Sequence, residues 1–250
     1  MSVTLTIFRQ CCYTLLVALL SPNASLSAAT NSAERTVAFA KLPDWRGTWK
    51  LIGSTVTIDD KLGTRAVTNA PYNAEWQTKY AVARAAVALQ RDSYERFCYA
   101  GVPRMMASPE LLMFVLSPEE TVVLGSRHDI RHLWADGRAH TPVDEMWPMF
   151  WGDSIAHWEG LTLVVDTISL KGDLWLDPTG ANLSDEMRVT ERTNLGSKGR
   201  LRNEKTIVDP VALTKPWTFA REFARTTLDD LPEEDCQWTA GSAGRLRAQQ

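Results

Sequence analysis

Several sequence patterns that mark common enzyme classes are missing from this chain of 250 residues. It has no glycine-rich phosphate loop, no Gly-x-Ser-x-Gly nucleophile motif and no Cys-x-x-Cys pair, so phosphate-binding, serine-hydrolase and dithiol redox chemistry lack their usual signatures. Histidine is scarce, with four residues in all. Two of them, His128 and His132, would lie ~13 Å apart on one strand, too far to bind one ion. We therefore predict no metal site and no cofactor.

Long apolar runs are also missing. The apolar segment Cys11–Leu20 is about half the ~20 residues that a membrane-spanning helix needs. It follows Arg9 and precedes the small residues Ser27-Ala28-Ala29, a pattern typical of a secretory signal peptide. We predict a signal peptide over residues 1–29 with cleavage near Ala29, a periplasmic or secreted mature protein, and no membrane insertion.

The chain has no excess of basic charge. Residues 1–29 contain one of the 27 basic residues and no acid, so their removal changes the net charge from −3 to −4. A nucleic-acid or anionic-membrane partner requires a concentrated basic surface. The composition therefore argues against both kinds of partner.

Two cysteines remain after the signal peptide, Cys98 and Cys236. Disulfides persist in an oxidising compartment, so we predict a structural bridge between them. The alternative, a catalytic thiol, needs an activating base, and neither cysteine has a histidine near it in the sequence.

Short runs of strand-forming residues dominate the chain. One begins near Asp44 and contains the Gly-x-Trp of Gly47 to Trp49, and a helix of roughly twenty residues is predicted from its N-cap Asn73. The other strand-like runs are 111–116, 121–124, 129–134, 153–158, 161–168, 187–193, 201–208 and 217–225. About nine strands with one substantial external helix predict a mainly β, mainly antiparallel barrel that is closed or nearly closed, because closure removes exposed edges. We expect a flexible tether over residues 30–41, one barrel domain over 42–240 and a frayed tail over 241–250.

A β-hairpin is the best-defined part of this pattern. If Glu159-Gly160 form its two-residue turn, Asp153 lies opposite Asp166, and both share a face with His157. Opposed carboxylates ~5 Å apart tend to share a proton. The face is therefore a candidate acid–base site, although an ordinary outward polar face has the same composition.

Two charged residues are expected inside the barrel. Glu191 alternates with apolar residues on its strand, and Arg221 lies between Phe219 and Phe223 on the last one. A buried charge requires a partner, so a Glu191–Arg221 ion pair is the structural interpretation. In the functional one, Arg221 binds a ligand anion while Glu191 exchanges a proton.

Five further residues are candidates for substrate contact. Two of them also have a structural interpretation: His132 as a hydrogen-bonded core or rim residue, and Trp151, with its aromatic neighbours, as packing at the barrel end. The five candidates are Arg131, His132, Trp151, Arg104 and Met105.

The hairpin region is also where the chain resembles known proteins. Trp-Gly-Asp-Ser-Ile-x-His-Trp-Glu-Gly-x-Thr-Leu-Val-Val-Asp-Thr, from Trp151 to Thr167, resembles the signature of a large family of exported bacterial proteins, mostly of unassigned function. The resemblance implies a lipocalin-like barrel and hardly specifies a reaction. The chain departs from the family pattern before Ser184, where Ala181-Asn182-Leu183 replace a His-Pro-His run. Other matching segments are 71–77, 103–106, 136–140, 175–177, 189–192, 209–210 and 215–218.

Two functions follow as hypotheses. In the first, the barrel is a cofactor-independent enzyme of the lyase, decarboxylase or isomerase type acting on an aromatic or hydrophobic small molecule. Asp153, His157 and either Asp166 or Glu191 would be acid and base, with Arg221 or Arg131 binding the anion. In the second, the same pocket binds and carries a hydrophobic small molecule without catalysis. The sequence does not indicate the oligomeric state.

Overall fold

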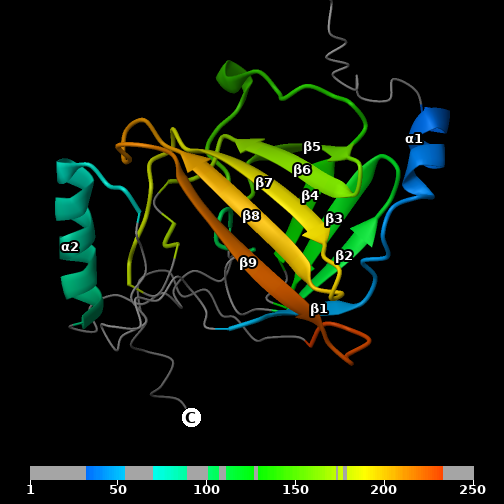
Figure 1. Ribbon diagram of the computed structural model, residues 1–250. Coiled ribbons are helices and arrows are strands. Elements are labelled where there is room, and N and C mark those ends of the chain that lie inside the picture. The colour runs from blue at the N-terminus through cyan, green and yellow to red at the C-terminus, as the bar shows by residue number, and fades with distance from the viewer. Residues whose placement is uncertain are drawn as a thin grey trace, which may run out of the picture.

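A computed structural model describes residues 32–53, 70–88, 101–106, 111–126, 129–172, 174–176 and 179–232. At its centre is a closed barrel in which nine strands follow one another in chain order and β9 pairs with β1 (Figure 1). The predicted mainly β closed barrel is therefore confirmed. The strands are β1 Thr48–Leu51, β2 Leu112–Leu116, β3 Glu120–Gly125, β4 Asp129–Trp134, β5 Asp153–Glu159, β6 Thr162–Ile168, β7 Arg188–Leu195, β8 Leu201–Val208 and β9 Trp217–Arg225. The predicted signal peptide, both cysteines of the predicted bridge and the tail 241–250 lie outside the described residues.

The barrel is mainly antiparallel, as predicted, but its sheet is mixed. Strands β4 and β5 are parallel and meet at a single pair, Trp134 with Ile155. Residues 135–152, which include the short helix η3 (Val143–Glu145), make a long connection between them (Figure 1). A tight hairpin joins two strands that run in opposite directions. A long connection, in contrast, lets the next strand run parallel to the previous one.

Two apolar clusters fill the two ends of the barrel. One contains Leu201 and Phe223, and the other contains Ile207 and Trp217, which lie at the opposite ends of β8 and β9. Strand β8 alternates strictly between inner and outer positions. Its inward side chains between the clusters are polar, so a polar layer separates the two apolar ends.

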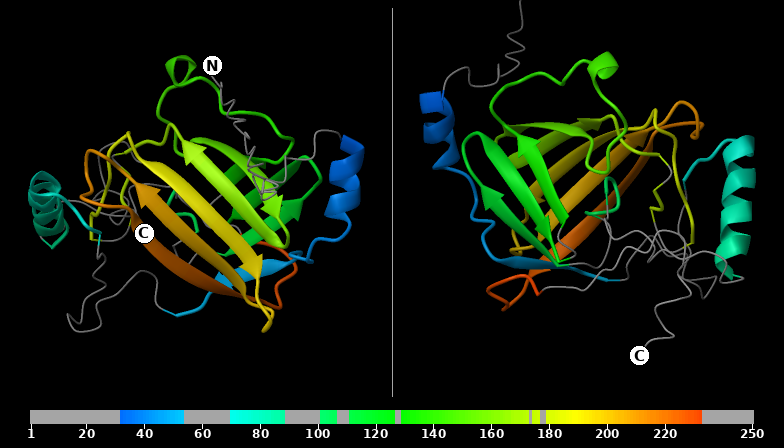
Figure 2. Two further views of the ribbon diagram at one scale, coloured as in Figure 1. Left: turned by 45° about the horizontal axis from the view of Figure 1, so that its top comes forward. Right: turned by 180° about the vertical axis from the view of Figure 1, so that it is seen from behind.

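Two longer helices lie outside the barrel, on opposite sides of it (Figures 1 and 2). Helix α2, Ala74–Ala88, is the predicted external helix, and Asn73 is its N-cap because its Oδ1 accepts the Trp76 N–H at 2.9 Å. Trp76 belongs to the cluster at one barrel end, called the α2 end below. Among the described residues, no helix combines the length and apolarity that a membrane span requires.

Helix α1, Ser32–Phe39, occupies most of the segment predicted as a flexible tether, and this prediction is wrong for those residues. Arg35 of α1 forms an ion pair with Glu119 in the β2–β3 turn, with 2.6 Å between Nη2 and Oε2. Tertiary contacts commonly stabilise short helices that propensity alone does not predict. The barrel end beside α1 is called the α1 end.

Candidate functional site

The β5–β6 hairpin differs from the prediction by one position in its turn. Glu159 pairs with Thr162, so Gly160 and Leu161 form the turn, and Gly160 has a positive φ of 60°. Asp153 therefore pairs with Ile168 and not with Asp166. The displaced turn shifts the cross-strand partner of each β5 residue by two positions along β6. Because side chains on a strand alternate between the two faces, a shift of two positions keeps each side chain on the same face. Asp153, His157 and Asp166 still share one face, as predicted.

This face is the outer face of the barrel. The alternate residues Ser154 and Ala156 are buried inside, whereas the His157 side chain is 53% exposed. Glu191 is buried inside, with 1% of its surface exposed. The barrel wall thus divides the predicted catalytic set, with three members outside and Glu191 within.

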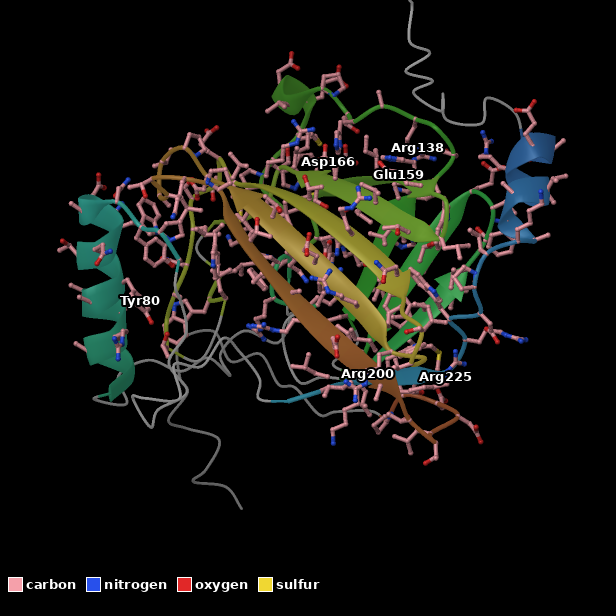
Figure 3. The ribbon with its side chains drawn as sticks, viewed as in Figure 1. Tyr80, Arg138, Glu159, Asp166, Arg200 and Arg225 are labelled. Atoms are coloured by element: carbon pink, nitrogen blue, oxygen red, sulfur yellow. The ribbon has the colours of Figure 1, made fainter. Side chains whose placement is uncertain are left out.

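Outside, a histidine that sequence reasoning missed joins the two aspartates. His140 Nδ1 lies 2.9 Å from Asp153 Oδ2, and His140 Nε2 lies 2.9 Å from Asp166 Oδ2. Arg188 Nε also donates to Asp166 Oδ1 at 2.7 Å. Carboxylates only accept hydrogen bonds, so the ring donates to both in its protonated form. Figure 3 shows Asp166 on the same side of the barrel as Arg138, whose motif with His140 was visible in the sequence.

The surroundings of Asp166 keep it ionised. Partial burial raises the pKa of Asp166, but hydrogen bonds from Arg188 and His140 outweigh burial and lower it overall. An aspartate with a lowered pKa is a poor proton donor at neutral pH. This group is therefore suited to holding a cation in place.

Inside the barrel, a second cluster forms around Glu191. Arg131 Nη1 lies 2.5 Å from Glu191 Oε2, and Lys205 Nζ lies 3.3 Å from Glu191 Oε1. Arg131 also donates to Thr167 Oγ1 at 2.9 Å. Lys205 donates to the Met106 carbonyl at 3.0 Å. Two cations thus face one carboxylate in the polar layer.

Burial and charge shift these groups in different directions. Burial raises the pKa of Glu191, but attraction to Arg131 and Lys205 prevails and lowers it to about 2. Burial lowers the pKa of Lys205 to about 8, even though Glu191 opposes this shift. Glu191 is therefore a fixed anion at neutral pH and is unsuited to proton exchange. Sequence reasoning missed Lys205, which the alternation of β8 would have placed inside.

The three arginine candidates lie in three segments: Arg131 in β4, Arg221 in β9 and Arg104 in residues 101–106. Arg221 lies partly inside, with its guanidinium 5.1 Å from the centre of the Phe219 ring, and burial lowers its pKa. Glu191 forms ion pairs with Arg131 and Lys205, whereas the sequence analysis predicted Arg221 as its partner. Arg104 and Met105 are both buried, in the segment 101–106.

Two aromatic candidates have different positions. His132 stacks on Trp134 outside the barrel and is 51% exposed, since the inward positions of β4 are 129, 131 and 133. His132 is therefore not a core residue, and its interpretations as a rim residue or a substrate contact stay predictions. Trp151 is partly buried and packs against both apolar clusters, which fits its structural interpretation.

A hollow of about 420 Å³ lies between α1 and the α1 end of the barrel, and we call it the mouth hollow. Most of its lining is apolar, and no aspartate or glutamate among the described residues belongs to it. Its residues are Arg35, Ala38, Phe39, Lys41, Leu42, Pro118, Ala135, Gly137, Ala156, His157, Trp158, Gly160 and Leu161.

His140 with Asp153 and Asp166, the two aspartates that it joins, is called the His140 bridge. A second hollow of about 460 Å³, the wall hollow, lies beside it on the outer face of the barrel. It shares Gly137, Ala156 and His157 with the mouth hollow, so the two adjoin at the β4–β5 seam. Its other residues are Arg138, Ile155, Asp166, Arg188 and Thr190. Within the described part of the chain, no three His, Cys, Asp or Glu side chains are arranged to hold a metal ion.

Comparison with known proteins gives no further guide to these sites. No family model matches the chain, and no curated protein matches it.

Proposed function

We propose that this protein is an exported, lipocalin-like binding protein that holds a small hydrophobic anion in the mouth hollow. The observation that carries the proposal is the composition of that hollow: its volume suits a small ligand, and the described residues that line it are mostly apolar and include cations but no acid. Small-molecule sites of this kind combine apolar walls with a few polar groups that orient the ligand.

The apolar part of the lining comes from three directions. Phe39 and Leu42 belong to α1 and the segment after it, Trp158 to β5, and Leu161 to the β5–β6 turn. Leu161 is 59% exposed, although it is a large apolar side chain. A ligand seated here would cover it and gain about 25 cal/mol for each Å² of apolar surface removed from water.

The charges of the hollow favour an anion. Arg35 is paired with Glu119, and His157 lies 3.1 Å from Glu159. Lys41 has no ion pair within the described residues. A carboxylate, sulfonate or phenolate on the ligand would supply the opposite charge.

The barrel itself supports the lipocalin-like part of the proposal. Trp49 of the Gly-x-Trp motif is fully buried at the α1 end, and its Nε1 donates to the Trp45 carbonyl at 2.9 Å. The Arg225 guanidinium lies 4.8 Å from the centre of the Trp49 ring. This arrangement is consistent with the family resemblance noted from the sequence.

A cofactor-independent acid–base enzyme is the second candidate. It is supported by the His140 bridge at the edge of the wall hollow, where a substrate anion could approach Arg188. Against it, ion pairs lower the pKa values of Asp166 and Glu191, the carboxyls that would have to exchange protons. Consumption of aromatic acids by wild-type protein but not by His140→Gln would favour this enzyme.

Fluorescence titration with the hydrophobic anion 8-anilinonaphthalene-1-sulfonate tests the binding function. We expect saturable binding that weakens about tenfold in Lys41→Gln, the size of effect typical of a charge-assisted contact, and also in Leu161→Asn. Lys50→Gln and Leu228→Asn are matched controls, because Lys50 and Leu228 are exposed and outside the hollow. Absence of saturable binding, or equal effects of test and control variants, would reject the proposal.

A further inference from the structure

The edge of strand β5 that faces β4 borders the mouth hollow. Strands β4 and β5 share a single residue pair, Trp134 with Ile155, whereas β5 pairs with β6 over its whole length. Residues 156–158 of β5 line the hollow, together with residues 160 and 161 of the turn that follows. Beyond Ile155, no strand in the described part of the chain pairs with β5 on this side.

Strand β4 ends at this point because the chain turns away from β5. Asp136 Oδ1 accepts the Arg138 N–H at 3.1 Å, and Gly137 has a positive φ of 85°. Both features are typical of a tight turn. Within the described residues, no main-chain hydrogen bond joins residues 135–138 to β5. The edge of β5 thus continues along the hollow without a neighbouring strand.

The pairing of β5 with β6 determines which main-chain groups face the hollow. Glu159 and Thr162 close the two-residue turn, and the closing pair of such a hairpin is hydrogen-bonded. Hydrogen-bonded and non-hydrogen-bonded pairs alternate along an antiparallel ladder. Trp158, the next residue of β5, therefore directs its main-chain N–H and C=O away from β6 and toward the β4 side.

Trp158 presents one main-chain donor and one acceptor to the mouth hollow. Its residue lines the hollow, and no hydrogen bond joins its main chain to any other described residue on the β4 side. An unpaired strand edge is a template on which another extended chain can form main-chain hydrogen bonds. A peptide group offers the complementary pair, because its C=O accepts and its N–H donates.

The lining of the hollow defines the other parts of such a ligand. Phe39, Leu42 and Leu161 provide apolar surface against which hydrophobic side chains can pack. Lys41 belongs to the same lining, which contains no aspartate or glutamate among the described residues, so it favours a negative charge on the ligand. The C-terminal carboxylate of a peptide carries this charge.

We propose, on the basis of the binding function above, that the ligand is a short hydrophobic peptide with a free C-terminal carboxylate, which adds to β5 as an extended strand in the place that β4 leaves. Its main chain pairs with Trp158, and its carboxylate pairs with Lys41. Main-chain pairing provides affinity for extended peptides in general, whereas the apolar lining selects hydrophobic side chains.

Isothermal titration calorimetry with the peptide acetyl-Leu-Val-Leu tests the strand pairing. In each of three analogues, an ester oxygen replaces one of the three amide N–H groups. Successive N–H groups of an extended chain point to opposite sides, so either the central analogue alone or the two outer ones should bind about tenfold more weakly, the typical effect of one lost hydrogen bond. Equal losses in all three analogues, or no loss in any, would contradict the pairing.

Amide hydrogen exchange measured by NMR locates the pairing on the protein. The Trp158 N–H should exchange quickly in the free protein and at least about tenfold more slowly with saturating acetyl-Leu-Val-Leu, because the peptide carbonyl then accepts it. Lys198, exposed in the turn between β7 and β8, is the control and should exchange at the same rate in both states. Bound peptide with unchanged exchange at Trp158 would overturn the assignment.

A peptide with a C-terminal carboxamide tests the position of the charge. Wild-type protein should prefer acetyl-Leu-Val-Leu with its free carboxylate about tenfold over the carboxamide, the size of effect expected of a charge-assisted contact. The preference should disappear in Lys41→Gln and remain in Lys50→Gln, since Lys50 is exposed and outside the hollow. A preference that survives Lys41→Gln would contradict the pairing of the carboxylate with Lys41.

Failure of the peptide assignment and failure of the binding function give different results. If 8-anilinonaphthalene-1-sulfonate binds and acetyl-Leu-Val-Leu neither binds nor displaces it, the peptide assignment is rejected and the binding function stands. If neither compound binds, the binding function itself is rejected.

Discussion

Arg131 and Glu191 form an ion pair across the inside of the barrel, 2.5 Å from Nη1 to Oε2, with 2% of each side chain exposed. They belong to β4 and β7, which are not neighbours in the sheet. The pair therefore links separate parts of the wall, and Lys205 on β8 adds a second cation. A buried pair of this kind strongly destabilises a protein when one member is removed.

Glu191→Gln should therefore lower the free energy of unfolding at pH 7 by about 3–5 kcal/mol, because Arg131 and Lys205 remain as buried, unneutralised cations. The acid dependence has a definite sign. The pKa of Glu191 is lowered to about 2, so its contribution is complete above its ordinary pKa near 4.5 and is lost as pH falls from there toward 2. Urea unfolding from pH 6 to pH 2 checks this. The difference between wild type and variant should shrink with acid, and Glu222→Gln, at an exposed glutamate, should change little.

Lys205 should make stability rise with pH in a second, alkaline window. The pKa of Lys205 is about 8 in the folded protein, against the ordinary 10.5 in the unfolded chain. Between pH 8 and pH 10.5, Lys205 is therefore protonated in the unfolded chain and largely deprotonated in the folded protein. Stability should thus rise with pH across that window, by about 3 kcal/mol at most. In Lys205→Met the rise should disappear, whereas Lys50→Met, at an exposed lysine, should retain it. Unfolding curves at pH 8 and pH 10 measure the effect, and equal slopes for wild type and Lys205→Met would contradict it.

The closed barrel could be predicted from the sequence because its signals are local. Alternating apolar residues and turn residues define each strand, and the closure follows from the number of strands. The shared face of Asp153, His157 and Asp166 was also predicted correctly, although the turn was displaced by one residue. That displacement shifts every cross-strand partner by two positions, which leaves the side chains on the same face.

The direction of that face could not be predicted, because local composition does not decide it. The outward set of β5 contains Ile155, and the inward set contains Ser154, so both faces mix polar and apolar residues. The His140 bridge depends on the path of residues 135–152, which is not a local property. The helix α1 likewise depends on contacts with the barrel, such as the pair of Arg35 with Glu119.

His140→Ala should lower the free energy of unfolding by about 1–3 kcal/mol, because two partly buried carboxylates lose a shared donor. Asp153→Asn should then cost less in the His140→Ala background than in wild type, since the two residues interact directly. A double-mutant cycle measured by chemical unfolding gives the coupling. His132→Ala is the control, as His132 is exposed outside the barrel. Additive effects of His140→Ala and Asp153→Asn would show that the bridge does not form in solution.

The last prediction concerns how α1 closes the mouth hollow. Glu119 on the barrel and Arg35 on α1 lie 2.6 Å apart, and Arg35, Phe39 and Lys41 all line the hollow. Glu119→Gln should weaken the hold on α1 without affecting the barrel, because Glu119 lies in a turn outside both apolar clusters. Affinity for 8-anilinonaphthalene-1-sulfonate should fall several-fold, and trypsin should cleave after Arg35 or Lys41 faster than in wild type.

The melting temperature of the barrel should stay the same in Glu119→Gln, since the ion pair is partly exposed and contributes little to global stability. Glu145→Gln, at an exposed glutamate away from the hollow, is the matched control for both readouts. Faster cleavage with unchanged probe affinity would mean that α1 does not form part of the binding site. A lower melting temperature together with weaker binding would mean instead that the pair stabilises the barrel end, and that α1 does not act as a separate wall of the hollow.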